Sequence, residues 1–122
     1  MNQSRWSIVA MSLVMVSGLG GCRTGPGSFK AVADRSSVFR ARAIGLGEHL
    51  PNSQVIPSCI ERLHDPHPRV RLAASQELTR RTGKTFGYQP WADPPERAES
   101  IAQWRAWWNA WQSGLATKRR KG

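Results

Sequence analysis

The chain has 122 residues, and its 18 lysines and arginines against eight aspartates and glutamates give a formal charge of +10. A chain of this length has room for one small domain and not for several. The basic excess suits contact with anionic surfaces. The unusual feature of the composition is six tryptophans beside one tyrosine and three phenylalanines.

Residues 1–21 have the pattern of an export signal. Arg5 is the only charged residue before an apolar run over residues 6–19, which is too short to span a bilayer comfortably as a helix. The run ends in Leu19-Gly20-Gly21-Cys22, which resembles the lipobox of bacterial lipoproteins. The resemblance implies cleavage before Cys22 and attachment of acyl chains, palmitate among them, to that cysteine. The alternative is an ordinary secretory signal or an uncleaved anchor.

Residues 22–33 comprise the lipidated cysteine and a segment of glycine, proline and serine without periodicity, which predicts a flexible tether. Arg23, and not an aspartate, follows Cys22. In lipoproteins of Gram-negative bacteria, an aspartate after the cysteine retains the chain in the inner membrane. The resemblance therefore implies a membrane-anchored protein of the cell envelope that faces the periplasm, with the outer membrane favoured over the inner one.

Two stretches of the chain carry the same pattern 31 positions apart. Phe39-Arg40 with Ala43 recurs as Val70-Arg71 with Ala74. A period between 20 and 50 residues is typical of repeat proteins. We therefore expect residues 34–115 to form an all-α domain of stacked helical hairpins, with about one and a half repeats before the last helix.

The clearest helical pair lies over residues 55–81. Apolar residues at 55, 56, 59, 60 and 63 share one face of the first helix, which predicts that Cys59 is a small buried hydrophobe and not a reactive thiol. Pro68 suits the first turn of the second helix, with His67 as a weak N-cap. Gly83 stands where a left-handed residue would end that helix.

The stretch VIPSCIERLHDPHPRVRLAASQEL, residues 55–78, resembles a bacterial HEAT repeat of the short PBS-lyase type. The positions that carry the resemblance are Asp65, Pro68, Val70, Arg71, Ala74 and Leu78. The resemblance implies that apolar positions stack from repeat to repeat, and that Asp65 and Arg71 make polar contacts near the turn between the helices. Residues 36–47 match only the second helix of such a unit. A helical hairpin without repeat ancestry is the alternative.

The last predicted helix, over about 94–114, is rich in tryptophan. Asp93-Pro94-Pro95-Glu96 has the pattern of a helix start, with an aspartate N-cap and a glutamate at the capping-box position. One face of the helix carries Ile101, Trp104, Trp107, Trp108, Trp111 and Leu115. We expect this face, and above all its four tryptophans, to cap the helical pair as core. A membrane-surface helix and a platform for aromatic or glycan ligands are the alternatives.

The segment from Leu78 to Tyr88, followed by a tryptophan-rich helix, resembles the C-terminal part of small bacterial HEAT-like proteins. The resemblance implies that Phe86, Tyr88 and Trp91 anchor a loop that folds back on the domain. All five tryptophans after the leader would then be core residues.

No combination of residues in the chain predicts catalysis. Of the three histidines, His64 and His67 flank an aspartate on a turn without a third ligand, which is poor evidence for a metal site. There is no Gly-x-Ser-x-Gly motif and no phosphate-binding glycine loop. We therefore expect a non-enzymatic protein without cofactor, metal or small-molecule substrate.

The sequence favours a protein-protein interaction module of the bacterial envelope whose partner it does not identify. The predicted binding surface comprises Arg69, Arg80, Arg81 and Lys84 together with the basic tail over residues 116–122, in which Lys118, Arg119, Arg120 and Lys121 are charged. The alternative is a structural protein that bridges the lipid anchor to acidic polymers or anionic lipid through this tail. For an exported chain, nucleic acid is not an expected partner.

Overall fold

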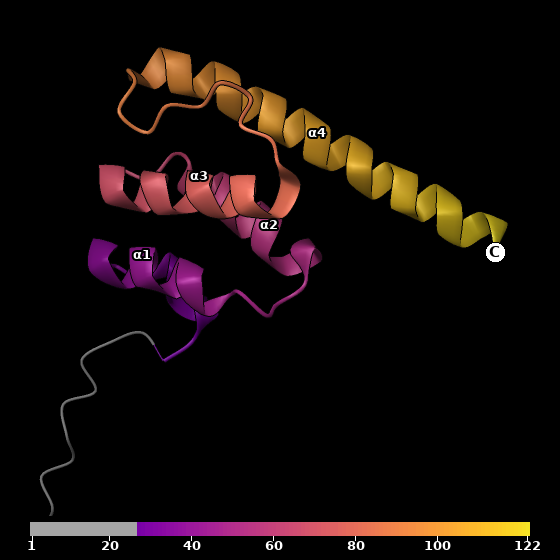
Figure 1. Ribbon diagram of the computed structural model, residues 1–122, viewed down its shortest axis with the longest axis horizontal. Helices are drawn as coiled ribbons and strands as arrows, with labels where there is room; N and C mark the ends of the chain where they lie inside the picture. The colour runs from indigo at the N-terminus through magenta and orange to yellow at the C-terminus, as the bar shows by residue number, and fades with distance from the viewer. Residues whose placement is uncertain (1–26) are drawn as a thin grey trace, which may run out of the picture.

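The computed structural model describes residues 27–122, so the predicted export signal and the predicted lipidation site Cys22 lie outside the described residues. All the regular secondary structure of this part of the chain is helical (Figure 1). A short 3₁₀ helix, η1 (Phe29–Ala33), precedes four α-helices: α1 (Ser37–Leu46), α2 (Asn52–Arg62), α3 (Pro68–Thr82) and α4 (Pro94–Lys121). The predicted all-α fold class is confirmed.

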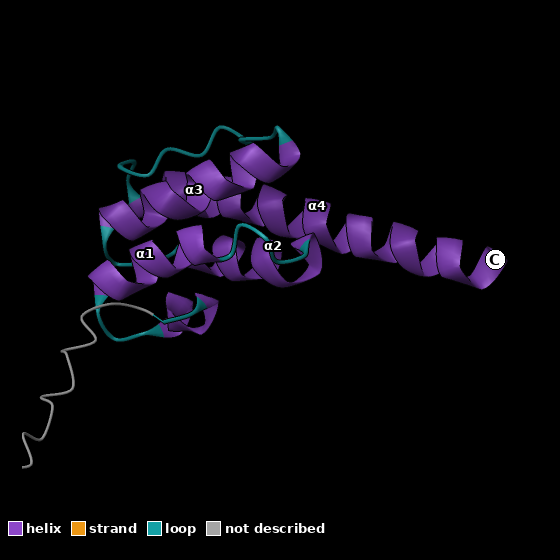
Figure 2. Cartoon of the chain, turned by 60° about the horizontal axis from the view of Figure 1, so that its bottom comes forward, coloured by secondary structure: helices purple, strands orange, loops and turns teal. Residues whose placement is uncertain are grey.

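The helices stack in a fixed order. η1 packs on α1, α1 packs on α3, and α2 packs on both α3 and α4. In both overall views α1 and α3 run side by side, whereas α4 extends well past the other helices toward the C-terminus (Figures 1 and 2). The stack therefore has one end at η1 and α1 and another end at α4.

The boundaries of α3 follow from its capping residues. The Nδ1 atom of His67 accepts a hydrogen bond from the Arg69 backbone N–H at 3.3 Å, and Pro68 occupies the first turn. Gly83 has φ of 71°, and its N–H donates to the Thr79 backbone oxygen. A left-handed glycine at this position is a common way to end a helix, so both predicted boundaries are confirmed.

The core lies between α2, α3 and the first half of α4. Ile56, Leu63 and Leu78 are almost fully buried, and Cys59 is a buried free thiol. From α4, Trp104 is 1% exposed and Trp108 is 6% exposed. Trp107 and Trp111 pack against this core but are only partly buried. The tryptophan face thus packs on the helical pair as expected, although two of its four rings lie at the margin.

The folded part begins earlier than residue 34. Phe29, which we expected in a flexible tether, is 7% exposed and belongs to the hydrophobic core. Its ring lies beside Gly47, where a Cβ atom would be 2.7 Å from a ring carbon. Because glycine leaves this space open, the aromatic ring can pack against the backbone, and residues 29–33 join the domain.

The expectations for the loop before α4 and for the end of α4 also need correction. Trp91 is 65% exposed and is not a core residue, because the loop is held by Tyr88 and Pro90 and the indole points outward. The side chain of Asp93 makes no capping hydrogen bond. α4 continues through Lys121, so residues 116–121 are helical and form no separate tail. Cations in the last turn favour this continuation, because they interact well with the helix dipole.

Candidate functional site

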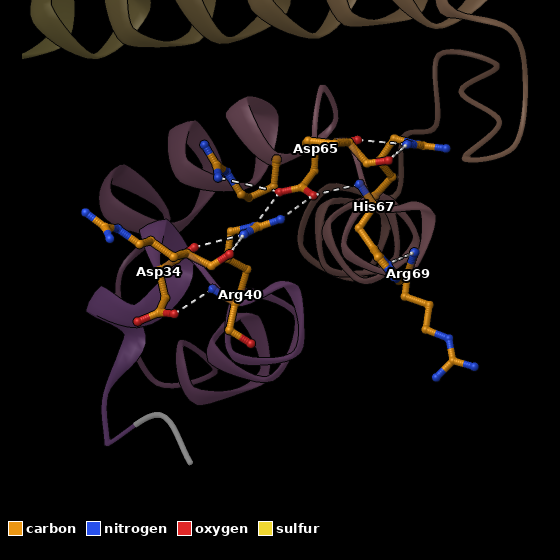
Figure 3. Close-up of polar contacts among 10 residues, drawn as sticks. Asp34, Arg40, Asp65, His67 and Arg69 are labelled. Atoms are coloured by element: carbon orange, nitrogen blue, oxygen red, sulfur yellow. Dashed lines mark hydrogen bonds and ion pairs between the residues drawn. The ribbon is translucent and has the colours of Figure 1, made fainter. Parts of the chain in front are cut away.

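The centre of the polar network is Asp65, at the turn between α2 and α3. The Nε and Nη2 atoms of Arg40, on α1, donate to the two carboxylate oxygens of Asp65 at 2.6 and 2.9 Å (Figure 3). The same carboxylate accepts the His67 backbone N–H at 2.9 Å, and an Arg62 nitrogen lies 3.6 Å away. The Asp65 side chain is 0% exposed, so an arginine from one helical unit is bound by a buried carboxylate of the next.

The environment of Asp65 favours its charged form. Burial by itself would raise the pKa of this carboxyl, but the hydrogen bonds from Arg40 and from the His67 backbone, with the charges of Arg40 and Arg62, bring the pKa below its ordinary value. Asp65 therefore remains a carboxylate, and the pair with Arg40 carries full charge on both sides.

The hydrogen bonds of Arg40 and Arg71 repeat with the 31-residue period of the sequence. Nη1 of Arg40 donates to the backbone oxygen of Asp34 and to that of the following residue, both at 2.9 Å. Nη1 of Arg71 donates to the backbone oxygen of Asp65 at 2.8 Å and to that of the following residue at 3.0 Å. The donor and both acceptors of the second set lie 31 positions after those of the first set. The repeat in the sequence is therefore also a repeat of hydrogen bonds in the structure.

The two aspartates repeat in the same way. Oδ1 of Asp34 accepts the Ser36 backbone N–H at 2.8 Å, just as the carboxylate of Asp65 accepts that of His67. Figure 3 shows both carboxylates at the starts of their helices. Asp34 and Arg40 thus belong to an earlier half-unit whose second helix is α1. The polar contacts that we expected of Asp65 and Arg71 are present, although the carboxylate of Asp65 binds Arg40 and not Arg71.

At the C-terminal end of the stack, a loop takes the place of a further repeat. Nε of Arg71 donates to the Pro90 backbone oxygen at 2.7 Å, where the corresponding atom of Arg40 meets a carboxylate. The Tyr88 hydroxyl donates to the Leu63 backbone oxygen at 2.6 Å, and burial raises the pKa of this phenol. Tyr88 is the loop anchor that we expected, and residues 83–93 close the stack together with α4.

The predicted binding-surface residue Arg81 has a structural role, and its assignment to that surface is wrong. Its side chain is 7% exposed. Its three nitrogens donate to the Glu77 carboxylate, to the Asn52 side chain and to three backbone oxygens between residues 47 and 50. Because every nitrogen of the guanidinium group has a partner within the domain, Arg81 fixes the connection between α1 and α2.

The other predicted surface residues are accessible. Arg69 and Lys84 are exposed, while the Arg80 side chain is 52% exposed and forms an ion pair with Glu77. Lys118, Arg119, Arg120 and Lys121 are all exposed on the last turn of α4. Arg69 lies at the start of α3, Arg80 and Lys84 lie near its end, and the other four lie at the end of α4, so these cations do not form one patch.

A groove between the starts of α1 and α3 contains residues that the sequence analysis missed. It is lined by Ser37, Val38, Ala41 and Arg42 from α1, and by His67 and Arg69 from α3. Val38 is 59% exposed, and Leu46 on the same helix is 50% exposed. The spacing of Val38, Arg42 and Leu46, four residues apart, places them on one side of a helix and could have indicated this surface.

Among the remaining side chains of residues 27–122, Arg97 and Trp104 have buried nitrogens without a hydrogen-bond partner. The Cys59 thiol is buried, and burial raises its pKa to about 12. Within residues 27–122, no three metal-binding side chains are gathered around one point. None of the helices in this range combines the length and the hydropathy needed to cross a membrane. Comparison with protein-family models, with curated proteins and with solved structures finds no match to this chain.

Proposed function

We propose that the protein is a non-enzymatic, HEAT-like interaction module of the bacterial cell envelope, anchored through acylated Cys22 and binding a partner protein with its helical stack. The observation that carries the proposal is the exposed surface along α1 and the start of α3. Val38 and Leu46 are exposed on one side of α1 with Arg42 between them, and Arg69 lies across the groove. Exposed apolar side chains together with arginines are typical of a surface that binds another protein.

The charges of this surface lack partners within the domain. Among residues 27–122, neither Arg42 nor Arg69 forms a side-chain ion pair. Both arginines are among the residues that line the groove containing Val38. Arginine is enriched in protein interfaces because its planar group forms several hydrogen bonds and also packs on apolar surfaces. The surface therefore suits a protein with apolar and acidic side chains.

The proposed anchor supports a location close to a membrane. Six residues separate Cys22, the last residue of the lipobox-like Leu19-Gly20-Gly21-Cys22, from Phe29, which belongs to the core. Even a fully extended segment of six residues spans only about 20 Å. A domain attached in this way would meet partners that are themselves at the membrane surface, so low affinity for a single partner could suffice.

The experiment is an affinity purification of the lipidated protein from detergent-solubilised membranes, with Cys22→Ala as the unanchored control. We expect one protein at close to equimolar amount, and at least about tenfold less of it with Arg42→Glu and Arg69→Glu combined. Lys30→Glu serves as a matched control, because Lys30 is exposed on η1, away from the groove. Recovery of lipid or polysaccharide alone would contradict the proposal.

A second function is favoured by the C-terminal half of α4. The helix continues to Lys121, so four cations are displayed on a rigid tip beside the partly buried Trp111 and Leu115. Such a tip could bind anionic lipid or an acidic polymer. Each Lys or Arg near an anionic membrane contributes about 1 kcal/mol of binding free energy. This function predicts that deletion of residues 118–121, or added salt, abolishes binding to vesicles with anionic lipid. The first function predicts that partner recovery is unchanged by the deletion.

A further inference from the structure

The N-terminal end of the stack has an unused acceptor for an arginine. We propose that the outer face of α1 docks an α-helix of the partner protein, and that this helix presents an arginine to the carboxylate of Asp34. The inference rests on the proposed function and specifies which surface carries it and what the partner offers.

The first argument is the equivalence of Asp34 and Asp65. Asp65 binds one backbone N–H and, in addition, the guanidinium group of Arg40 on α1, the equivalent helix one unit earlier. Asp34 binds the equivalent backbone N–H of Ser36 but forms no ion pair within residues 27–122. Its second carboxylate oxygen points away from the other side chains drawn in Figure 3. The Asp34 carboxylate is therefore positioned to accept an arginine. That arginine would come from a helix packed on the exposed side of α1.

The second argument is the side of α1 that is exposed. Val38, Arg42 and Leu46 follow one another at four-residue spacing on the helix surface. The residues 31 positions after Arg42 and Leu46 are Ala73 and Glu77 of α3, and both lie in the groove between α3 and α1. The exposed side of α1 thus corresponds to the side of α3 on which α1 itself packs. A helix docked on α1 would continue the stack by the same geometry.

The third argument concerns the chemistry of the occupant. Asp34 could pair with a cation, Arg42 could donate to an acidic group, and Val38 and Leu46 could pack on apolar side chains. A second copy of this chain fits poorly: Arg42 lies midway between Val38 and Leu46, so a two-fold axis that paired these apolar residues would oppose Arg42 to itself. A lipid surface also fits poorly, because Asp34 at the end of the strip would be repelled by anionic head groups. A partner helix with an arginine, an acidic residue and apolar side chains satisfies all four positions.

The experiment uses the full, lipidated chain with Leu46 replaced by the photo-crosslinking residue p-benzoylphenylalanine, irradiated in intact membranes. Peptide mapping then identifies the crosslinked segment of the partner. We expect an amphipathic segment, helical by circular dichroism, that contains an arginine. The control places the same photo-crosslinker at Gln103, which is exposed on α4, and it should give no such product.

Charge exchange separates docking from a structural role of Asp34. Asp34→Asn keeps the oxygen that accepts the Ser36 N–H but removes the charge, and Asp34→Arg reverses it. We expect about tenfold or greater loss of crosslinked product with either variant, and recovery with Asp34→Arg when the partner arginine is changed to aspartate. Unchanged circular dichroism of both variants would show that the domain remains folded.

Three results would overturn the inference: a crosslink to a second copy of the chain, a crosslink to an extended segment or to lipid, or a product that does not depend on Asp34. If a partner is still purified in the last case, the proposed function stands and only the docking surface is wrong. If no protein is purified at all, the proposed function itself fails.

Discussion

The two ends of the stack are built from the same unit, but the contacts that cover the terminal units differ. At the C-terminal end, Arg71 donates to the Pro90 backbone oxygen, Tyr88 binds the backbone of Leu63, and Trp104 closes the core. At the N-terminal end, Asp34 binds only a backbone N–H, and Leu46 remains half exposed. The comparison teaches that a terminal unit covered by a loop and a helix uses groups such as Arg71 and Tyr88 within the domain, whereas an uncovered unit leaves groups such as Asp34 and Leu46 accessible.

The largest effect on stability should come from removing the Trp104 side chain, which closes the core at the C-terminal end. Trp104→Ala deletes a side chain that is 1% exposed and should lower the free energy of unfolding by about 3–5 kcal/mol. Leu46→Ala, at the open end, should change it by less than about 0.5 kcal/mol. Urea unfolding followed by circular dichroism measures both. Similar losses of unfolding free energy in the two variants would mean that the two ends of the stack are equally well packed, which contradicts the account.

The two equivalent aspartates provide the sharpest contrast. Asp65→Asn removes a buried charge from its pair with Arg40 and should cost about 3 kcal/mol. Asp34→Asn keeps its hydrogen bond to the Ser36 N–H and should cost less than about 0.5 kcal/mol. Chemical denaturation of both variants at pH 7 is the measurement. An equal cost at both positions would show that Asp34 already has a charged partner within the chain.

Two glycines near the end of α1 test how η1 is packed. Gly47→Ala would place its Cβ 2.7 Å from a ring carbon of Phe29, and such overpacking costs about 1–3 kcal/mol. Gly45→Ala meets no atom within 4 Å and should stabilise the helix by up to about 1 kcal/mol. Thermal unfolding of both variants should therefore shift in opposite directions. A neutral Gly47→Ala would contradict the placement of Phe29.

The acid stability of the domain should depend on Asp65 and Glu77. The pKa of each carboxyl is lowered in the folded chain, through hydrogen bonds from Arg40 for Asp65 and from Arg80 and Arg81 for Glu77, against an opposing effect of burial. A lowered pKa means that the unfolded chain binds more protons, so the stabilisation is present above about pH 4 and is lost as the pH falls further. Denaturant titrations between pH 2 and 7 should show this loss, and a smaller loss with Asp65→Asn. A pH dependence that Asp65→Asn leaves unchanged would contradict this assignment.

The smallest effect concerns Cys59, whose thiol should be unreactive in the native state. Burial raises its pKa to about 12, and thiols react as thiolates. A thiol reagent should therefore label Cys59 only after unfolding, as located by mass spectrometry. Rapid labelling of the folded protein would mean that the core opens easily around α2.

The sequence predicted the helical pair well because its signals are local. The apolar spacing over residues 55–63, Pro68 in the first turn of α3 and Gly83 after its end each depend on a few neighbouring residues. The 31-residue period also predicted that α1 is equivalent to α3. These features need no knowledge of distant parts of the chain.

The errors concern contacts between distant residues. Phe29 joins the core because Gly47, far along the chain, leaves room for its ring. In the sequence Arg81 is one of two adjacent cations, yet in the structure it donates to backbone oxygens of the connection before α2. Trp91 resembles its neighbours in type but points to solvent. The exposed strip on α1 was missed because a half-matched repeat gives no indication of which of its sides remains open.

The most direct test of the account is a double-mutant cycle between Arg40 and Asp65, with Arg40→Met and Asp65→Asn measured singly and together by urea unfolding. The account predicts a coupling energy of about 1–3 kcal/mol, because the two side chains pair across successive units of the stack. Additive effects, within about 0.5 kcal/mol, would contradict the claim that this arginine joins one unit to the next.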